Sequence, residues 1–583
     1  MPNPMPNPQR RFHLWTRRTV AKRPSATTIP NTVPTTEVIF LIMRRLRAPL
    51  IVVVTTFSFC GAGMMLMPGL DAAGNPYRLN IFDAFYQMTI TLTTVGYTEA
   101  PYPFSYPQRM WLSMSIFLLV ISWGYAIAVF FALIQGAAFQ AAVTTQKFRR
   151  QVRRMVEPFV IVAGYGDAGR IVGTQLDKHY RRFVLVDARA DRVQSVTADQ
   201  LSFDVPALEG DCATTAVLGM AGLGHRDCEG VLALTDDDDT NLAVVMTASL
   251  LRPDLPVLGR CGEDRTRARM EGFAPGAAIN ADDRFSEYLA LSIHRPVGQQ
   301  LLRWLMDNDQ ERLPPLRPDL AERRWLVCAE GEFSNSVVND LAGIGVSVEF
   351  VDPAGSAPDF SGALGFVAGT DNDTLNIALA EQARHANSEA YLVLRQKTNA
   401  KRALVDTLKV DSIHIATELI AREVLARILT PVFWSFVEHT LTRDEQWATQ
   451  VRDHVLDRCG PRTPERDAVT LSADQAPAIA DWLRRGHGLT LRDMMRQPAD
   501  REATLPVAAL VLIRDGESRF MPAADTGLLL GDEVLFVGKP DGLSQVIEIC
   551  HYPPVVEYVA TGRDAPSSWV WSRLAERRRT RTG

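Results

Sequence analysis

The sequence has few cysteines, and they are scattered. The 583 residues include 7 cysteines that lie far apart and form no CxxC motif. This argues against a disulfide framework and against a zinc ribbon, so we expect most of the chain in a reducing compartment. A net charge of only −5 excludes a dedicated nucleic-acid-binding protein, and 46% hydrophobic residues exclude a disordered chain. The length suggests about four structural units.

Nearly all long charge-free stretches lie before Lys147, and few follow it. One covers residues 48–70, of which 50–70 supply the roughly 20 apolar residues that span a bilayer. The second covers residues 110–146, and its first part, to about residue 140, is expected to be the inner helix of a pore. Buried helices of soluble proteins rarely hold such long apolar runs, so the sequence predicts two membrane spans.

Basic residues set the expected orientation of these spans. Three arginines lie between 44 and 47 and five basic residues between 147 and 154, whereas the connecting loop holds only Arg78 and Arg109. We therefore expect a multi-pass protein of the cell inner (plasma) membrane with both termini cytoplasmic. Residues 1–48 are expected to form a disordered basic arm that ends in a short interfacial helix at 38–43.

The loop between the predicted spans contains a third apolar stretch, residues 81–92, which is too short to cross a bilayer and predicts a re-entrant helix. Directly after it come Thr93, Thr94, Val95, Gly96, Tyr97, Thr98 and Glu99. This segment resembles the T-V-G-Y-G selectivity filter of tetrameric potassium channels. The resemblance implies a homotetramer whose filter is formed by Thr94, Val95, Gly96, Tyr97 and Thr98, with K+ held at the first four.

The physics of such a filter is general. Stacked rings of carbonyl oxygens from several copies replace the hydration shell of a cation, and Gly96 permits the required dihedral angles because it lacks Cβ. Thr98 stands where the family usually has a second glycine, and a β-branched residue is costly at positive φ. A weakly selective cation channel therefore stays open as an alternative. Gly124 is a candidate gating hinge, with close packing against a neighbouring helix as the alternative.

After residue 157 the pattern becomes that of a soluble α/β protein. An apolar strand at 159–163 leads into a glycine motif, and a second strand at 183–186 ends in an acidic residue. Further strands at 207–209, 231–234 and 257–259 alternate with helices, which predicts a doubly wound parallel sheet. A nucleotide, NAD or ADP/ATP, is expected to bind there. The residues expected to bind this nucleotide include Gly164, Gly166, Asp167, Ala168, Gly169 and Asp187.

Two further motifs follow strands of this sheet: Gly210-Asp211, and a run of four aspartates between Thr235 and Asn241. They resemble motifs of regulator-of-potassium-conductance (RCK) domains, the cytoplasmic gating domains of prokaryotic potassium channels and transporters. The resemblance adds Asp211 and Thr235 to the nucleotide site. Divalent cation binding (Ca2+) at the acidic run is open beside ordinary helix capping. Thr235 and Arg260 stand where some calcium-gated relatives have acidic side chains.

A second copy of the pattern follows. Gly331 and Asp352 are separated by the same interval as Gly166 and Asp187, and Thr370 then echoes Thr235 after a shorter interval. The second copy has alanine and serine where the first has Gly164 and Gly169, so its role is expected to be mainly structural. A leucine-rich helical segment at 286–305 is expected to dock the first domain against a partner. Strands at 507–513 and 533–537 predict a β-rich C-terminal subdomain.

The expected fold is thus an α-helical membrane pore domain, with two transmembrane helices and a re-entrant pore helix, followed by two α/β Rossmann-like RCK domains. The expected boundaries are an arm at 1–48, a pore domain at 49–146, a linker at 147–157, and RCK domains at 158–322 and 323–583. The expected function is passive, ligand-gated K+ conduction. No enzyme is expected, because the 10 histidines are scattered and no cluster suits covalent catalysis; a membrane-anchored NAD-dependent oxidoreductase is the alternative.

Overall fold

The computed structural model describes residues 29, 36–96, 101–306, 312–316, 320, 324–352, 359–360 and 362–563. The chain divides into two compact units. Of the described residues, those within 30–155 and 219–221 form one unit, and all others form the second.

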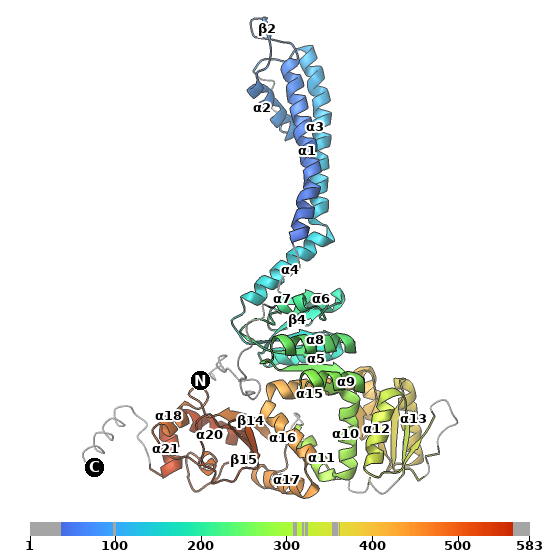
Figure 1. Ribbon diagram of the computed structural model, residues 1–583, viewed down its shortest axis with the longest axis vertical. Coiled ribbons are helices and arrows are strands. Elements are labelled where there is room, and N and C mark those ends of the chain that lie inside the picture. The colour runs from blue at the N-terminus through green and yellow to red at the C-terminus, as the bar shows by residue number, and fades with distance from the viewer. Residues whose placement is uncertain are drawn as a thin grey trace, which may run out of the picture. The chain divides into compact units, whose positions relative to one another are not determined.

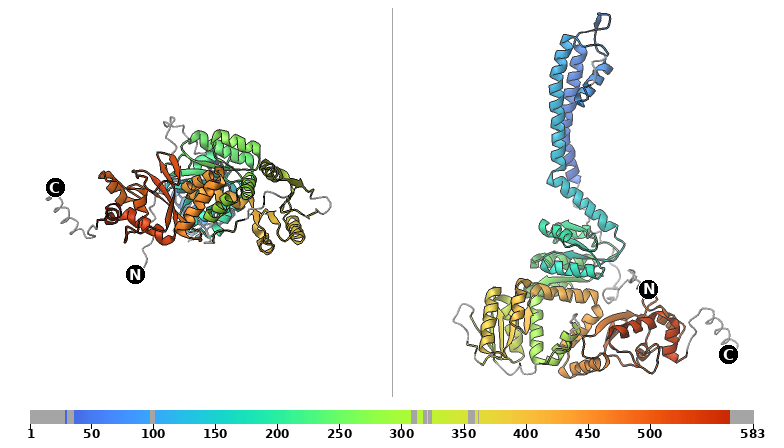
Figure 2. Two further views of the ribbon diagram at one scale, coloured as in Figure 1. Left: turned by 90° about the horizontal axis from the view of Figure 1, so that it is seen from below. Right: turned by 180° about the vertical axis from the view of Figure 1, so that it is seen from behind.

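The first unit is built on two long helices, α1 (Thr36–Leu66) and α3 (Tyr106–Ile134). They lie side by side in both views that show them lengthwise (Figures 1 and 2). Among the described residues, Leu46–Leu66 and Tyr106–Ile134 are long and apolar enough to cross a membrane. The segment predicted as an interfacial helix at 38–43 is part of α1, which continues through Pro49 without a break.

The ends of these helices differ from the predicted spans. α1 stops at Leu66, and β1 (Gly69–Leu70) then pairs antiparallel with β2 (Pro76–Tyr77). α3 begins at a capping box formed by Ser105 and Gln108 and ends before Gly136. Gly136 is the N-cap of α4 (Ala137–Arg153), so the inner helix is shorter than predicted and most of the predicted linker is helical.

The second unit contains a six-stranded parallel sheet in the order β5-β4-β3-β6-β7-β8. The strands are β3 (Phe159–Ala163), β4 (Arg182–Asp187), β5 (Ala207–Glu209), β6 (Cys228–Ala233), β7 (Val257–Cys261) and β8 (Ala278–Asn280). The helices are α5 (Asp167–Lys178), α6 (Ala190–Ala198), α7 (Thr215–Met220), α8 (Asp238–Leu251) and α9 (Asp264–Phe273). This is the predicted doubly wound sheet, with β8 as an additional strand that was not predicted.

A second parallel sheet has the order β10-β9-β11-β12-β13. Its strands are β9 (Trp325–Ala329), β10 (Val348–Phe350), β11 (Gly365–Gly369), β12 (Tyr391–Arg395) and β13 (Ser412–His414). Its helices are α12 (Gly331–Gly343), α13 (Asp373–Ala386), the 3-10 helix η1 (Asn399–Lys401) and α14 (Arg402–Thr407). The order repeats β4-β3-β6-β7-β8, and the described residues between β10 and β11 hold no strand equivalent to β5.

The two copies exchange one helix each. α10 (Ala281–His294) and α15 (Ala416–Leu429) hold equivalent places, since each follows the last strand of its copy. Yet Phe285 and Leu289 of α10 are buried in the core of the second sheet, while Ile420 and Val424 of α15 are buried against the first. Figure 1 shows α10 beside α12 and α15 beside α5. The predicted domain boundary at 322 therefore cuts the chain between two cores that share helices.

The segment predicted as one docking helix at 286–305 is two helices, because Pro296 follows Arg295, the C-cap of α10. The second is α11 (Pro296–Met306), which packs with α16 (Pro431–Thr442) and α17 (Glu445–Cys459). Docking of this segment against a partner stays a prediction.

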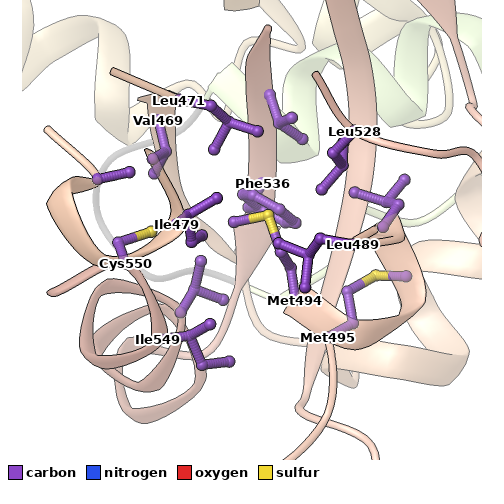
Figure 3. Close-up of a cluster of buried hydrophobic side chains, with 14 of the residues drawn as sticks. Val469, Leu471, Ile479, Leu489, Met494, Met495, Leu528, Phe536, Ile549 and Cys550 are labelled. Atoms are coloured by element: carbon purple, nitrogen blue, oxygen red, sulfur yellow. The ribbon is translucent and has the colours of Figure 1, made fainter. Parts of the chain in front are cut away.

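The C-terminal subdomain has an antiparallel sheet in the order β14-β17-β15-β16. The strands are β14 (Glu465–Thr470), β15 (Val507–Arg514), β16 (Glu517–Phe520) and β17 (Glu533–Gly538), and the helices are α18 (Pro477–Arg484), α19 (Leu491–Met494), α20 (Pro540–His551) and α21 (Pro553–Thr561). Apolar side chains fill both faces. Trp304 and Phe436 pack on one face, and Phe536, Ile479 and Met494 meet on the other (Figure 3).

Candidate functional site

The glycine motif forms the turn between β3 and α5. Gly164 has φ of +99°, and a Cβ there would lie 2.7 Å from the backbone nitrogen of Thr235. A Cβ at Gly169 would lie 2.1 Å from the carbonyl oxygen of Gly164. Side chains do not fit at either place, so α5 starts directly on the turn with its N–H groups facing the crevice at the carboxyl ends of the strands.

Asp187 ends β4 beside this turn and is only 4% exposed. Its Oδ2 accepts a hydrogen bond from the backbone N–H of Tyr165 at 2.7 Å, and its Oδ1 accepts one from the backbone N–H of Arg189 at 2.8 Å. A carboxylate has about four acceptor positions. Asp187 therefore lies where the motif predicts, fixed by two main-chain donors, with acceptor capacity left for ribose hydroxyls.

Thr235 and Asp211 have structural partners. Oγ1 of Thr235 donates to Oδ1 of Asn241 at 2.7 Å, and the Asn241 amide donates to the carbonyl oxygens of Thr235 and Arg260 at 2.9 and 3.0 Å. Asn241 is fully buried and so ties the ends of β6 and β7 together. Asp211 accepts from the backbone N–H of Ala213 at 2.9 Å, just before α7.

The acidic run contributes an ion bridge. Oδ2 of Asp236 lies 2.8 Å from Nη2 of Arg192, and Oδ1 lies 2.7 Å from Nη1 of Arg260. Partial burial disfavours the charged carboxylate, but the two guanidinium groups outweigh it and lower the pKa of Asp236. Arg192 and Arg260 were not among the predicted site residues. Since both are distant from Asp236 in the sequence, no local pattern identifies the bridge.

The other aspartates of the run are engaged elsewhere. Asp237 caps α8 by accepting from the backbone N–H of Thr240 at 2.8 Å, and Asp238 accepts from the backbone N–H of Gly262 at 3.0 Å. Among the described residues no group of three or more His, Cys, Asp or Glu side chains is placed to hold a metal ion. The residues present therefore do not fit a Ca2+ ion at this run.

The second copy repeats the strand-end network but has Ala329 and Ser334 at the places of Gly164 and Gly169. Thr370 donates to Asn376 at 2.7 Å, as Thr235 does to Asn241. However, Phe333 takes the place of Ala168, and its ring stacks on His414 with centroids 5.1 Å apart. A Cβ on Gly369 would lie 2.3 Å from this ring. An aromatic side chain thus packs against the ends of β9 and β11.

The predicted filter follows α2 (Ile81–Leu92), whose bounds are those predicted. Asn80 caps this helix, and Thr93 ends it. Thr94 has φ of +59° and Gly96 has φ of +60°. A β-branched residue in the left-handed region is strained, and such strain is concentrated at functional sites. Tyr97 and Thr98 lie outside the described residues, and K+ binding by the segment stays a prediction.

Gly124 lies within an unbroken α3. No atom lies within 4 Å of a Cβ built at this glycine, so within the described chain it serves no close packing. The break in helical structure comes later, at Gln135 and Gly136. A hinge at Gly124 stays a prediction.

Taken together, the glycine turn, Asp187 and the parallel strand order define a Rossmann-type nucleotide-binding domain. More specifically, residues 160–279 match the family model of the TrkA-N domain, so this part of the chain is a TrkA-N (RCK) domain.

Two curated relatives come from Methanocaldococcus jannaschii. "Potassium channel protein 1" is 20% identical over 187 residues, which are 32% of this chain and 54% of that protein. "Probable potassium channel protein 2" is 23% identical over 190 residues, 32% of this chain and 52% of that protein. The chain spans about half the length of the curated relatives it matches. It is homologous to these archaeal potassium channel proteins, which are named as channels and not as enzymes.

Among solved structures, the chain is similar to "GsuK channel bound to NAD", with 13% identity, coverage of 89% of this chain and 100% of that chain, and a TM-score of 0.40. It is also similar to "Crystal structure of the GsuK bound to ADP", with 15% identity, coverage of 70% and 99%, and a TM-score of 0.35.

Proposed function

We propose that the chain is the subunit of a ligand-gated potassium channel of the plasma membrane, in which four chains surround one pore. One observation carries this proposal. The sequence T-T-V-G-Y follows a short helix, α2, between two helices long enough to span a membrane, in a chain homologous to potassium channel proteins. Both termini are proposed to be cytoplasmic.

The filter segment supports assembly from several copies. Irregular backbone at membrane depth is tolerated only where it lines a cavity or is buried in protein. In a single chain Val95 is 65% exposed, which favours its burial against other copies. One strand cannot build a ring of carbonyls, whereas a closed symmetric oligomer can. The carboxyl end of α2, which carries a partial negative charge, would favour a cation near Thr93.

Gating is assigned to a nucleotide in the crevice beside Gly164 and Asp187. NAD, ADP and ATP all carry ribose hydroxyls for Asp187 and phosphates for the start of α5. Since α4 directly follows α3 in the chain, it is the segment that would carry a ligand-dependent displacement to the pore. A ligand opens or closes the pore only through different affinities for the two states. A divalent cation is not part of the proposal.

Flux through liposomes that contain the purified full chain tests the pore. Gly96→Ala forces a side chain onto φ of +60° in the filter, so K+ flux should fall below detection. Gly74→Ala is the matched control, because Gly74 also has positive φ (+84°) and free space, but lies in the β1–β2 turn. Full flux in Gly96→Ala, or no K+ flux in the wild type, would refute the proposed pore.

Two further measurements separate the alternatives. Reversal potentials in mixed K+ and Na+ distinguish a selective pore from the weakly selective one that Thr98 leaves open. Flux in the presence of NAD, ADP or ATP, compared between the wild type and Gly164→Asp, tests the first crevice. An identical nucleotide response of both proteins would remove this crevice from gating.

A further inference from the structure

We propose that Arg192 and Arg260 bind the phosphate groups of the nucleotide and that Asp236 competes with those phosphates for the same two guanidinium groups. This inference rests on the proposed nucleotide site in the first crevice and names the groups that recognise the ligand there. It also assigns to the crevice an internal bridge that a ligand has to displace.

The bridge spans three separate elements. Arg192 comes from α6, Asp236 from the loop between β6 and α8, and Arg260 from β7. The two nitrogen–oxygen distances, 2.8 and 2.7 Å, are those of charge-assisted hydrogen bonds. Breaking the bridge would free α6 from the carboxyl ends of β6 and β7.

The position of Arg192 connects the bridge to the glycine turn. A Cβ built on Gly166 would lie 3.3 Å from Nη1 of Arg192 and 3.4 Å from Oδ2 of Asp236. The bridge therefore lies against the residue that precedes α5. A phosphate drawn to the N-terminus of α5 arrives at this same place and meets both the guanidinium and the carboxylate.

Exposure favours exchange of the carboxylate for a ligand. The side chains of Arg192 and Arg260 are 23% and 24% exposed, whereas that of Asp236 is 57% exposed. The carboxylate can thus turn into water once its bonds to the arginines are exchanged for bonds to a ligand, while the arginines are held in the crevice. Arg192 also lies 3.7 Å from Asp187, which keeps its guanidinium near the predicted ribose position. A terminal phosphate offers more charge and more acceptor oxygens than one carboxylate.

The second copy provides an internal comparison. Arg395 and Asp371 repeat the Arg260–Asp236 pair at 2.8 Å. However, no basic residue occurs among residues 353–362 after Asp352, whereas Arg189 and Arg192 closely follow Asp187. The ring of Phe333 also lies against Gly369 at the end of β11 in that copy. Among the described residues, an aspartate bridged by two arginines at the strand ends thus occurs in the first copy and not in the second.

The ligand class follows from this chemistry. A nucleotide with a diphosphate or triphosphate can replace the carboxylate at both arginines, whereas adenosine cannot. Displacement of Asp236 would make the occupied crevice differ from the empty one, and such a difference is what a gating ligand requires. Each molecule bound would have to break the internal bridge, which weakens its apparent affinity.

Binding of ADP, adenosine and inorganic pyrophosphate to the purified full chain tests the inference. Asp236→Asn removes the competitor, so ADP and pyrophosphate should bind several-fold more tightly while adenosine binding stays constant. Arg192→Gln and Arg260→Gln should each weaken ADP binding by about tenfold, the order expected for one charge-assisted hydrogen bond, again without an effect on adenosine.

Asp239→Asn is the matched control. Asp239 belongs to the same acidic run, makes no ion pair among the described residues, and loses the same charge on substitution. Its effect on ADP should stay below twofold. Equal tightening by Asp239→Asn and Asp236→Asn would show a general charge effect and overturn the inference. Unchanged or weaker ADP binding by Asp236→Asn would overturn it as well.

Two outcomes separate this inference from the proposed function. If neither ADP nor NAD nor ATP binds the wild type, the proposed nucleotide site is refuted. The inference about the arginines is tested separately by pyrophosphate, and it is overturned if Arg192→Gln leaves pyrophosphate binding unchanged. If ADP binds but the double variant Arg192→Gln/Asp236→Asn shows the sum of the two single effects, the residues act separately and the competition is refuted. The thermal unfolding midpoint of each variant, close to that of the wild type, excludes a folding defect.

Discussion

The two α/β copies share a framework and differ in what lies inside it. In both, a threonine, an asparagine and an arginine carbonyl join neighbouring strand ends by three hydrogen bonds of nearly equal length. The threonine hydroxyl donates to the asparagine at 2.7 Å in both copies. The asparagine amide donates to the threonine carbonyl at 2.9 Å in the first copy and 2.8 Å in the second, and to the arginine carbonyl at 3.0 and 2.9 Å. The small residues differ: the first copy has glycines at 164 and 169, where a Cβ would not fit, whereas the ring of Phe333 lies against Gly369 in the second copy. The hydrogen bonds that hold the strand ends are thus separable from the residues that shape the turn.

Phe333→Ala should produce the largest loss of stability, because it removes a large ring from the buried core of the second copy. The ring is buried among Phe285, His414 and Gly369, and truncation of a buried phenylalanine costs about 3–5 kcal/mol. Denaturant unfolding of the full chain measures the loss, with the exposed Leu404→Ala as the control in the same copy. A loss below about 1 kcal/mol would mean that the ring does not fill the core as described.

We expect intermediate losses of unfolding free energy, about equal in size, for Asn241→Ala and Asn376→Ala. Each removes side-chain hydrogen bonds of about 1 kcal/mol and leaves buried strand-end groups unpaired, so about 2–3 kcal/mol is expected for each. ADP binding should separate the two, because Asn241 holds the end of β6 beside the Asp236 bridge and Asn376 does not. Equal weakening of ADP binding by both variants would contradict the assignment of the ligand to the first crevice.

His414→Ile should have the smallest effect and should show it in the pH dependence. Burial lowers the pKa of His414 below its ordinary value, although Nε2 lies 2.8 Å from Asp282, which favours the charged form. The unfolded chain therefore binds a proton more readily, and stability should fall as the pH drops below about 6.5. The first copy has the buried Ile279, in β8, at the equivalent position.

Unfolding free energies at pH 7.0 and 5.5 provide the measurement for His414. The wild type should lose about 1 kcal/mol more than His414→Ile over this interval, since one differently bound proton changes stability by about 1.4 kcal/mol per pH unit at most. Burial raises the pKa of Glu229 to about 7, but that group titrates in both proteins and cancels. Parallel pH profiles for the two proteins would show that His414 is not the cause.

The sequence was most informative where a pattern is local. Apolar runs and glycines located β3, α5 and α2, because strand length, helix period and turn chemistry are set by neighbouring residues. Which sheet a helix packs against is not determined by neighbouring residues in the sequence. The pattern of α10 and α15 is the same whichever sheet each helix covers, so their exchange left no signal. The arginines that hold Asp236 are also distant in sequence.

The exchange of α10 and α15 makes either copy alone incomplete. A fragment that ends at residue 322 would carry Phe285 and Leu289 without the core that buries them, and its α5 would lack the cover that Ile420 and Val424 provide. Deletion of the second copy would therefore expose apolar surface on the first. Removal of either half would thus leave apolar helix faces of the other uncovered, so we expect the two halves to fold together or not at all.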